Sequence, residues 1–177
     1  EKLAVVHQES IVVLSDNRYA HLLPDDATLV IGGAREAAEA FAGHPIDAAP
    51  ALAVPGRLEE RADAGEVRDG AHNPAGARWL ADRLRPRRFV LCVSVLRDKD
   101  VDGILGPLAE LGDTIVATTS SSARALPAAE LADHARPRFA HVEAVDDPHE
   151  ALARAHALGA PVLVTGSLYL LAELEGG

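Results

Sequence analysis

The sequence predicts an α/β protein with a mostly parallel, doubly wound (Rossmann-like) sheet. From residue 57 onward, β-branched and apolar runs alternate regularly with helical segments, giving five strand–helix units. The runs are nearly continuous in apolar residues, which is typical of parallel strands that helices cover on both faces. The chain has 177 residues, of which 48% are hydrophobic and 25% charged, and this is enough to bury such a core.

The sequence marks the start of each helix in these units. Asn73 and Asp100 are expected N-caps of the first two helices, because their side-chain oxygens can accept from free backbone N–H groups. Proline at the first helical position favours helices that open near residues 127 and 148, and Ser167 is an expected cap of the last helix. The predicted strands are 66–70, 87–95, 113–119, 139–145 and 161–166, and the predicted helices are 74–84, 101–111, one from 127, one capped by Asp147 and a short one after 167.

The first 54 residues differ in pattern from the rest. Residues 46–56, with Pro50 and Pro55, carry little periodic signal and are the expected boundary between two parts of the chain. The chain contains no Met and opens on Glu1-Lys2, so we expect it to be a piece of a longer protein. The elements expected before the boundary are strands at 10–16 and 27–33 and a helix at 34–43.

Composition excludes some classes of partner. Seventeen basic and 27 acidic side chains give a net charge of −10, so we expect no nucleic-acid partner. Residues 57–99 are locally basic, which suits either a small anionic ligand or a solvated helix face. The longest apolar runs, 89–95 and 160–164, are far too short to cross a membrane. The single cysteine, Cys92, indicates a reducing cytoplasm and is expected to be a buried apolar side chain.

Three polar clusters, at 69–74, 97–100 and 165–169, lie beyond the carboxyl ends of predicted strands, where α/β sheets bind ligands. In the cluster at 69–74, Asp69 could accept from a ribose hydroxyl or hold a cation, and His72 could donate to a carboxylate or phosphate. Alternatively, Asp69 only ends the strand and His72 only fills the turn. In the cluster at 165–169, the role of Ser167 could be limited to capping.

Two further positions stay open between a structural and a functional interpretation. The cluster at 97–100 contains Lys99, one of only two lysines, which is either a functional side chain or, as is usual for an exposed loop lysine, a solvated one. Arg57 follows a Pro-Gly turn just before the sheet, where either a hinge or a phosphate contact is plausible. The chain contains no phosphate-binding G-x-x-x-x-G-K-[ST] loop of its own.

Four segments carry a combined signal, namely PGRLE (55–59), DGAHNPAGA (69–77), LRDKDV (96–101) and VTGSLYLLAE (164–173). In this order and spacing they resemble the C-terminal domain of the folylpolyglutamate synthase/dihydrofolate synthase family. This family belongs to the Mur ligase superfamily of ATP-dependent amide-bond ligases. The resemblance implies a Mur-ligase-type C-terminal domain at 54–177. It also implies that 1–53 is the incomplete tail of a central ATP-binding domain, because EKLAVV (1–6) is similar to a motif of that domain.

The resemblance implies an ATP-dependent ligase that adds L-glutamate to folate or dihydropteroate through an acyl-phosphate intermediate. Arg57 and Asp69 match the family's ATP contacts, and His72 and Ser167 match positions that hold glutamate. Lys2 matches a lysine that supports Mg²⁺ once it is carbamylated. The intact enzyme is therefore expected to use ATP and Mg²⁺ and to act as a cytoplasmic monomer.

The resemblance also limits what this chain is expected to do alone. The phosphate loop belongs to the family's N-terminal ATPase region, so the chain by itself is expected to be inactive, and no residue in it is a certain catalytic group. The family's asparagine near the adenine has no match in 34–41. The acceptor and the product length are not determined, because the acceptor site falls mostly in the missing region.

Two alternative interpretations remain. The chain could belong to another Mur-type amino-acid ligase, one that builds peptidoglycan peptide, although LRDKDV and GSLYL disfavour this. It could also be a non-catalytic α/β ligand-binding module in which the same motifs serve only as caps and turns.

Overall fold

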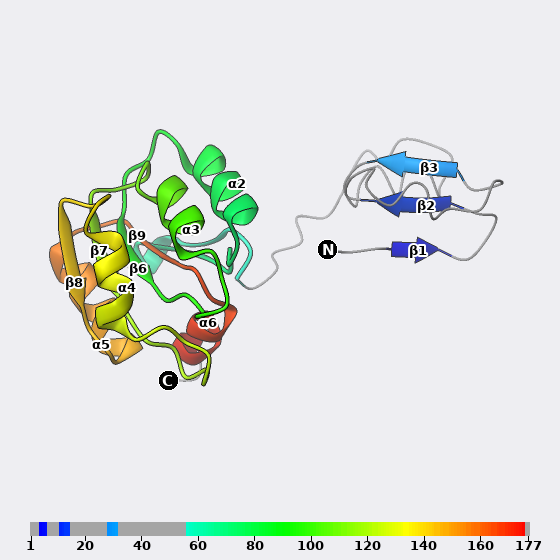
Figure 1. The fold of residues 1–177 in the computed structure, drawn as a ribbon. Helices are drawn as coiled ribbons and strands as arrows, with labels where there is room; N and C mark the ends of the chain where they lie inside the picture. Colours follow the sequence, from blue (N-terminus) through cyan, green and yellow to red (C-terminus); the bar gives the residue numbers. More distant parts are fainter. Residues whose placement is uncertain (1–3, 7–10, 15–27, 32–55, 176–177) are drawn as a thin grey trace. The chain divides into compact units, whose positions relative to one another are not determined.

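The computed structural model describes residues 4–6, 11–14, 28–31 and 56–175 (Figure 1). The chain divides into two compact units, Glu1–Leu52 and Ala53–Gly177. In the first unit, the two predicted strands are confirmed, and the predicted helix at 34–43 lies outside the described residues. The strands are β1 (Ala4–Val6), β2 (Ile11–Leu14) and β3 (Thr28–Ile31), with β2 antiparallel to β1 and parallel to β3.

The second unit is built on a six-stranded sheet in the order β4-β5-β9-β6-β7-β8. All neighbouring strands are parallel except β4 and β5, so the predicted α/β fold with a mostly parallel sheet is confirmed. Strand β4 is a short polar edge strand that was not expected from the sequence. It pairs with β5 because Gly65, at φ +66°, reverses the chain between them. The bounds are β4 Glu59–Arg61, β5 Glu66–Asp69, β6 Val90–Val93, β7 Thr114–Ala117, β8 His141–Ala144 and β9 Val162–Thr165.

Helices cover both faces of this sheet (Figure 1). On one face lie α2 (Pro74–Leu84), α3 (Val101–Leu108) and α4 (Ala128–Ala135), and on the other lie α5 (Pro148–Leu158) and α6 (Leu168–Glu175). Three predicted caps are confirmed, since side-chain oxygens of Asn73, Asp100 and Asp147 accept from backbone N–H groups in the first turns of α2, α3 and α5. Helix α3 ends three residues earlier than predicted. The N–H groups of Glu110 and Leu111 donate to the carbonyls of Pro107 and Leu108, three residues back, and these tight turns replace the helical hydrogen bonds.

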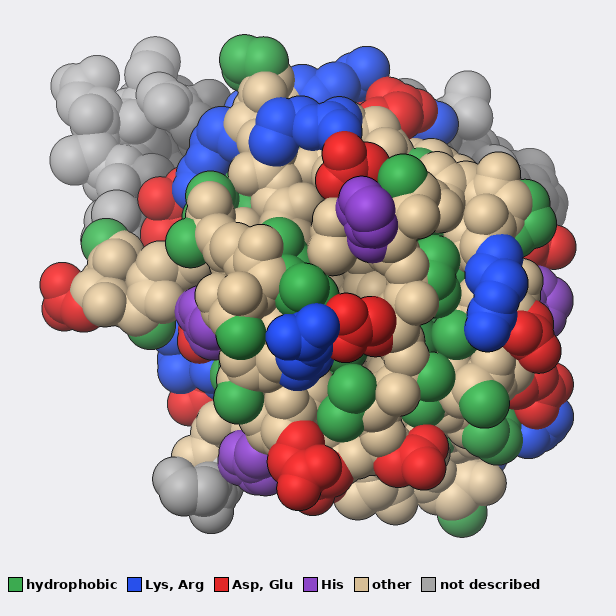
Figure 2. All heavy atoms as spheres, turned by 90° about the vertical axis from the view of Figure 1, so that its left-hand side faces the viewer, with side chains coloured by type: hydrophobic (Ala, Val, Ile, Leu, Met, Phe, Trp, Pro, Cys, Tyr) green, Lys and Arg blue, Asp and Glu red, His purple; other side chains and the backbone are tan. Residues whose placement is uncertain are grey.

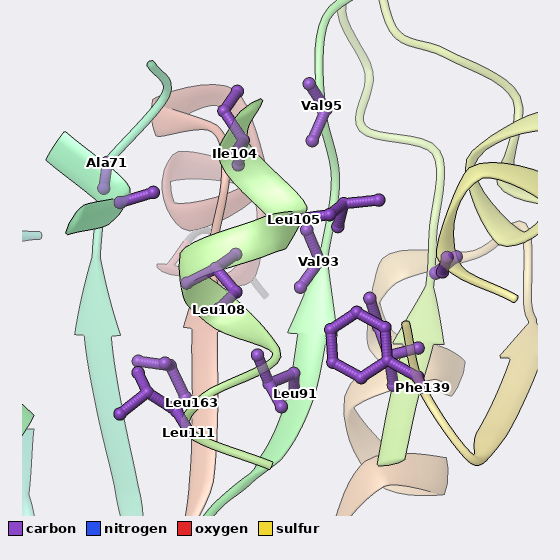
Figure 3. Close-up of a cluster of buried hydrophobic side chains, with 14 of the residues drawn as sticks. Ala71, Leu91, Val93, Val95, Ile104, Leu105, Leu108, Leu111, Phe139 and Leu163 are labelled. Carbon is purple, nitrogen blue, oxygen red and sulfur yellow. The ribbon is translucent and has the colours of Figure 1, made fainter. Parts of the chain in front are cut away.

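Alternation along the strands divides the core into two layers. Leu91 and Val93 of β6 point toward α3, where they meet Leu105 and Leu108 (Figure 3). Cys92, between them in sequence, belongs to the layer under α5 and α6. Because all of these side chains are fully buried, the helix packing fixes where the carboxyl ends of the strands lie.

The thiol of Cys92 is expected to be unreactive in the folded protein. Burial, followed by the charge of Glu66, raises its pKa to about 12, so almost no thiolate forms at neutral pH. We expect a thiol-specific chromogenic reagent to label the native protein very slowly and the denatured protein completely. Rapid labelling without denaturant would contradict the packing of α5 on β6.

The surface is mixed in character. On the face shown in Figure 2, several basic side chains gather along the top edge, and over the rest of the face basic, acidic and apolar side chains of the described residues are interspersed. None of the helices in the described part of the chain has the length and apolar character that a bilayer crossing requires.

Candidate functional site

The candidate site lies at the carboxyl ends of β5, β9 and β6. Thr165, the last residue of β9, is in register with Asp69 of β5 on one side and with Val93 of β6 on the other. After β5 and β6 the chain continues into α2 and α3 on one face, whereas after β9 it continues into α6 on the opposite face. Such a topological switch point is where open α/β sheets bind ligands.

The turn at 56–58 is held firmly against this edge, and it presents Arg57. The carbonyl of Gly56 accepts from the Gly70 N–H at 2.8 Å, and the N–H of Leu58 donates to Asp69 Oδ2 at 2.8 Å. Gly56 has φ +69°, in the left-handed region that glycine tolerates. The backbone is thus fixed on both sides of Arg57, whose side chain is exposed. A guanidinium on a fixed, exposed turn is suited to binding phosphate.

Asp69 is the buried last residue of β5. Its Oδ2 accepts from Leu58, and its Oδ1 accepts from the N–H of Ala71 at 2.8 Å, so it joins the turns on both sides. The interpretation that Asp69 ends the strand is therefore confirmed. Each carboxylate oxygen still has a second acceptor position, so a contact with a ribose hydroxyl stays a prediction.

His72 is anchored to its own turn. Its Nδ1 lies 2.9 Å from the carbonyl oxygen of Gly70. A carbonyl only accepts, so the proton is assigned to Nδ1, and Nε2 accepts when the ring is neutral and donates when it is protonated. The ring is half-buried, and its role in holding glutamate stays a prediction.

Ser167 begins α6 and is almost fully buried. Its Oγ accepts from the N–H of Tyr169 at 3.2 Å, which confirms the predicted capping role and leaves the hydroxyl proton free to donate elsewhere. The next residue, Leu168, lies against the turn after β5, since a Cβ on Gly70 would be only 2.2 Å from Leu168 Cδ2. The fold therefore brings the turn of His72 and the start of α6 side by side, although they are far apart in the sequence.

The loop after β6 lies at the same edge of the sheet and carries ion pairs on its surface. Asp98 pairs with Lys99 at 3.0 Å and with Arg124 at 3.4 Å. The hydrogen bond from Lys99 holds the pKa of Asp98 below its usual range. Exposed pairs of this kind contribute little to stability, so giving up either pair to an anionic ligand would cost the fold little.

The metal prediction is not tested by this geometry. Within the described residues, no group of three His, Cys, Asp or Glu side chains is placed to hold a metal ion. Lys2, the predicted support for magnesium, lies outside the described residues. A magnesium site on this chain therefore stays a prediction.

Sequence reasoning missed a buried group of charges beneath α6. Glu66 and Arg68 of β5 form an ion pair at 2.7 Å with only 6% of either side chain exposed, and Glu66 also binds His156 at 2.9 Å. Burial favours the neutral form of Glu66, but the hydrogen bonds from His156 and Arg68 outweigh it and lower the pKa of this carboxyl. The sequence does contain a signal for this pair. Glu66 and Arg68 are two residues apart in a predicted strand, so their side chains must lie on the same face of the sheet.

Comparison of the sequence with protein families and with curated proteins points to the same family of ligases. Residues 56–168 match the Mur ligase family, in its glutamate ligase domain. Over 94 residues, which is 50% of this chain, the chain is 49% identical to a dihydrofolate synthase/folylpolyglutamate synthase of Mycobacterium tuberculosis and covers 19% of that protein.

Solved structures of similar proteins share the fold. A folylpolyglutamate synthase of Mycobacterium tuberculosis, solved with ADP and AMPPCP, is 35% identical with a TM-score of 0.70, over 80% of this chain and 37% of that chain. A bifunctional folylpolyglutamate synthase/dihydrofolate synthase of Yersinia pestis, solved with Mn, AMPPNP and L-glutamate, is 27% identical with a TM-score of 0.62, over 71% of this chain and 32% of that chain.

The chain thus spans about a fifth of the curated relative's length. The family match extends over well over half of this chain, and it coincides with the sheet and the converging turns described above. The chain therefore belongs to the Mur ligase family and contains its glutamate ligase domain.

Proposed function

We propose that this chain is the C-terminal part of an ATP-dependent ligase that adds L-glutamate to folate or dihydropteroate. The observation that supports this most is the convergence of three turns at the switch point, those of Arg57, His72 and Ser167, within a domain of the glutamate ligase family. The high identity to a dihydrofolate synthase/folylpolyglutamate synthase supports the choice of substrates over those of other Mur-type ligases.

The proposed reaction has two chemical steps. The acceptor carboxylate takes the terminal phosphoryl group of ATP, and ADP leaves. The glutamate amine then attacks the activated carbonyl carbon, forming the amide bond as inorganic phosphate leaves and the amine loses a proton. When bound, Mg²⁺ would neutralise phosphate charge.

The residues of this chain bind and orient the two substrates in the proposed reaction. Arg57 binds the phosphates of ATP, and Asp69 accepts from its ribose while holding the Arg57 turn. His72 and Ser167 hold the incoming glutamate, whose carboxylates are favoured near the helix starts of α2 and α6. Phosphoryl transfer also needs a phosphate-binding loop to hold the ATP phosphates, and we propose that another part of the complete protein supplies it.

The decisive experiment uses the complete purified protein that contains this chain. With ATP and magnesium, we expect labelled L-glutamate to be incorporated into dihydropteroate, tetrahydrofolate or both, with equimolar ADP release. A nucleotide-linked peptidoglycan precursor is the matched control acceptor. Incorporation into that precursor alone, or no incorporation into any of the three, would contradict the proposed function.

The isolated chain of 177 residues is expected to show no folate-dependent ADP release, because it has no phosphate loop. Folate-dependent turnover by the chain alone would contradict its assignment as part of a larger catalytic unit. A cytoplasmic, monomeric enzyme remains our expectation for the complete protein.

Replacement of His72 by alanine is expected to affect the use of glutamate more than the use of ATP. In the complete protein, His72→Ala should raise the KM for glutamate about tenfold, the loss expected for a charge-assisted hydrogen bond, and change the KM for ATP much less. Steady-state kinetics with each substrate varied in turn measures this. Ser167→Ala tests the same site less cleanly, since losing an N-cap costs about 0.5–2 kcal/mol of stability. Equal effects on both KM values would contradict the assignment of His72 to glutamate.

A further inference from the structure

The buried charges under α6 form one connected network. Arg68 Nε binds Glu66 at 2.7 Å, and Arg68 NH1 donates to Glu175 at 3.1 Å and, more weakly, to the carbonyl of Leu174 at 3.4 Å. Glu175 also pairs with Arg61 of β4. The network therefore joins the edge of the sheet to the last turn of α6.

The same network continues toward the turn of Arg57. Arg61 Nε binds Glu59 Oε1 at 2.8 Å, and Glu59 Oε2 accepts from the N–H of Gly56 at 2.9 Å. These contacts hold the pKa of Glu59 below its usual range, with the Gly56 N–H as the largest cause. Through Glu175, the network links two segments of the candidate site.

Net stability alone does not account for a buried pair at this position. Removing Glu66 and Arg68 from water is costly, and apolar residues of similar size are often as stabilising or more so. Other side chains between the sheet and α6, such as Val164 of β9 and Leu170 of α6, are apolar and fully buried. What the ion pair provides, and an apolar pair would not, is a directional contact to the carboxyl end of α6.

Directional contacts matter here because α6 is short and carries Ser167 at its start. Its eight residues span about 12 Å, so a tilt of only about 5° about the last turn would move the first turn by about 1 Å. At its start the helix is located by the contact of Leu168 with Gly70, and at its end by Arg68. Both ends must be fixed for Ser167 to keep its place beside the turn of His72.

We infer that Arg68, whose side chain lies between β5 and α6, is a positioning residue for the glutamate site and acts through helix α6. The inference rests on the proposed function, because it concerns the site assigned to glutamate there. The Arg68 guanidinium is taken up by Glu66, Glu175 and the carbonyl of Leu174, so Arg68 acts through the helix that it holds.

The test is a double variant, Arg68→Met/Glu66→Leu, in the complete protein. It replaces both buried charges by apolar side chains of similar size, so the melting temperature is expected to stay close to that of the parent. We expect the KM for glutamate to rise about tenfold, as for a small misplacement of a binding group, while the KM for ATP changes less than twofold. The matched control is Arg154→Met/Glu143→Leu, which removes an exposed pair between α5 and β8 and should leave both KM values unchanged.

The outcomes are distinguishable from one another. A parental KM for glutamate in a folded double variant would overturn the positioning role of Arg68. If the double variant does not fold, Arg68→Lys decides in the same way, because it keeps the charge but loses the planar fork that spans Glu66 and Glu175. Absence of glutamate-dependent turnover in the parent would instead contradict the proposed function.

Discussion

Gly166→Ala is expected to lower the free energy of unfolding by about 3 kcal/mol, among the largest effects of any single methyl group in this domain. Gly166 has φ +96°, a backbone conformation that residues with a Cβ rarely adopt. A Cβ there would also lie 2.4 Å from the carbonyl oxygen of Ser94, which is backbone and cannot move aside easily. Because Gly166 directly precedes Ser167, we expect glutamate use by the complete protein to fall as well.

Variants of two other glycines distinguish the cost of the positive φ from the cost of the close approach to Ser94. Gly65 has φ +66°, but a Cβ added there would meet nothing within 4 Å, so Gly65→Ala should cost only the conformational penalty, about 1 kcal/mol. Gly106 lies in α3 with no other segment near its Cα, but it precedes Pro107, whose ring disfavours a helical residue with a Cβ before it, so Gly106→Ala should change stability by less than about 1 kcal/mol. Urea unfolding of the three variants measures all of these. Equal losses for Gly166→Ala and Gly65→Ala would contradict the close approach to Ser94.

Arg57→Ala in the complete protein is expected to reduce kcat/KM for ATP by about 10²–10³-fold, with an unchanged melting temperature. The side chain is exposed, so its removal disturbs no core, while the turn that presents it keeps its backbone hydrogen bonds. Arg57→Lys should recover only part of the activity, since lysine lacks the planar fork that binds phosphate through two hydrogen bonds. Steady-state kinetics at varied ATP, with thermal unfolding in parallel, measures both quantities.

Two further variants serve as controls for Arg57. Arg136→Ala removes an equally exposed arginine that pairs with Asp133, and it should leave ATP kinetics unchanged. Asp69→Ala should weaken ATP use and also lower stability, because Asp69 is buried and accepts from two backbone N–H groups. Normal ATP kinetics in a folded Arg57→Ala variant would mean that Arg57 serves only the turn.

Local signals in the sequence were sufficient for most of the fold. Apolar runs of the β6 and β9 type identify buried strands, because only parallel strands covered on both faces are apolar on both. Side chains such as Asn73 and Asp147 mark helix starts because capping depends on neighbours within one turn of the chain. Position 167 was identified as a cap for the same reason, and its hydroxyl does accept from the helix that it begins.

Long-range relations were beyond these signals. The short strand β4 is polar and exists through its pairing with β5, so no pattern within its three residues marks it. The order of the strands is a property of the whole sheet, and it alone puts β9 between β5 and β6.

Patterns in the sequence were enough to predict an α/β chain with helix starts at strand ends and to find the residues that resemble those of glutamate ligases. The contact of Leu168 with Gly70 and the hold of Asp69 on the turn of Arg57 became visible only in the folded domain. The same holds for the pairing and burial of Glu66 and Arg68. The physical reason is that periodicity and capping act within a few residues, whereas burial and charge pairing depend on which distant segments the packed sheet brings together.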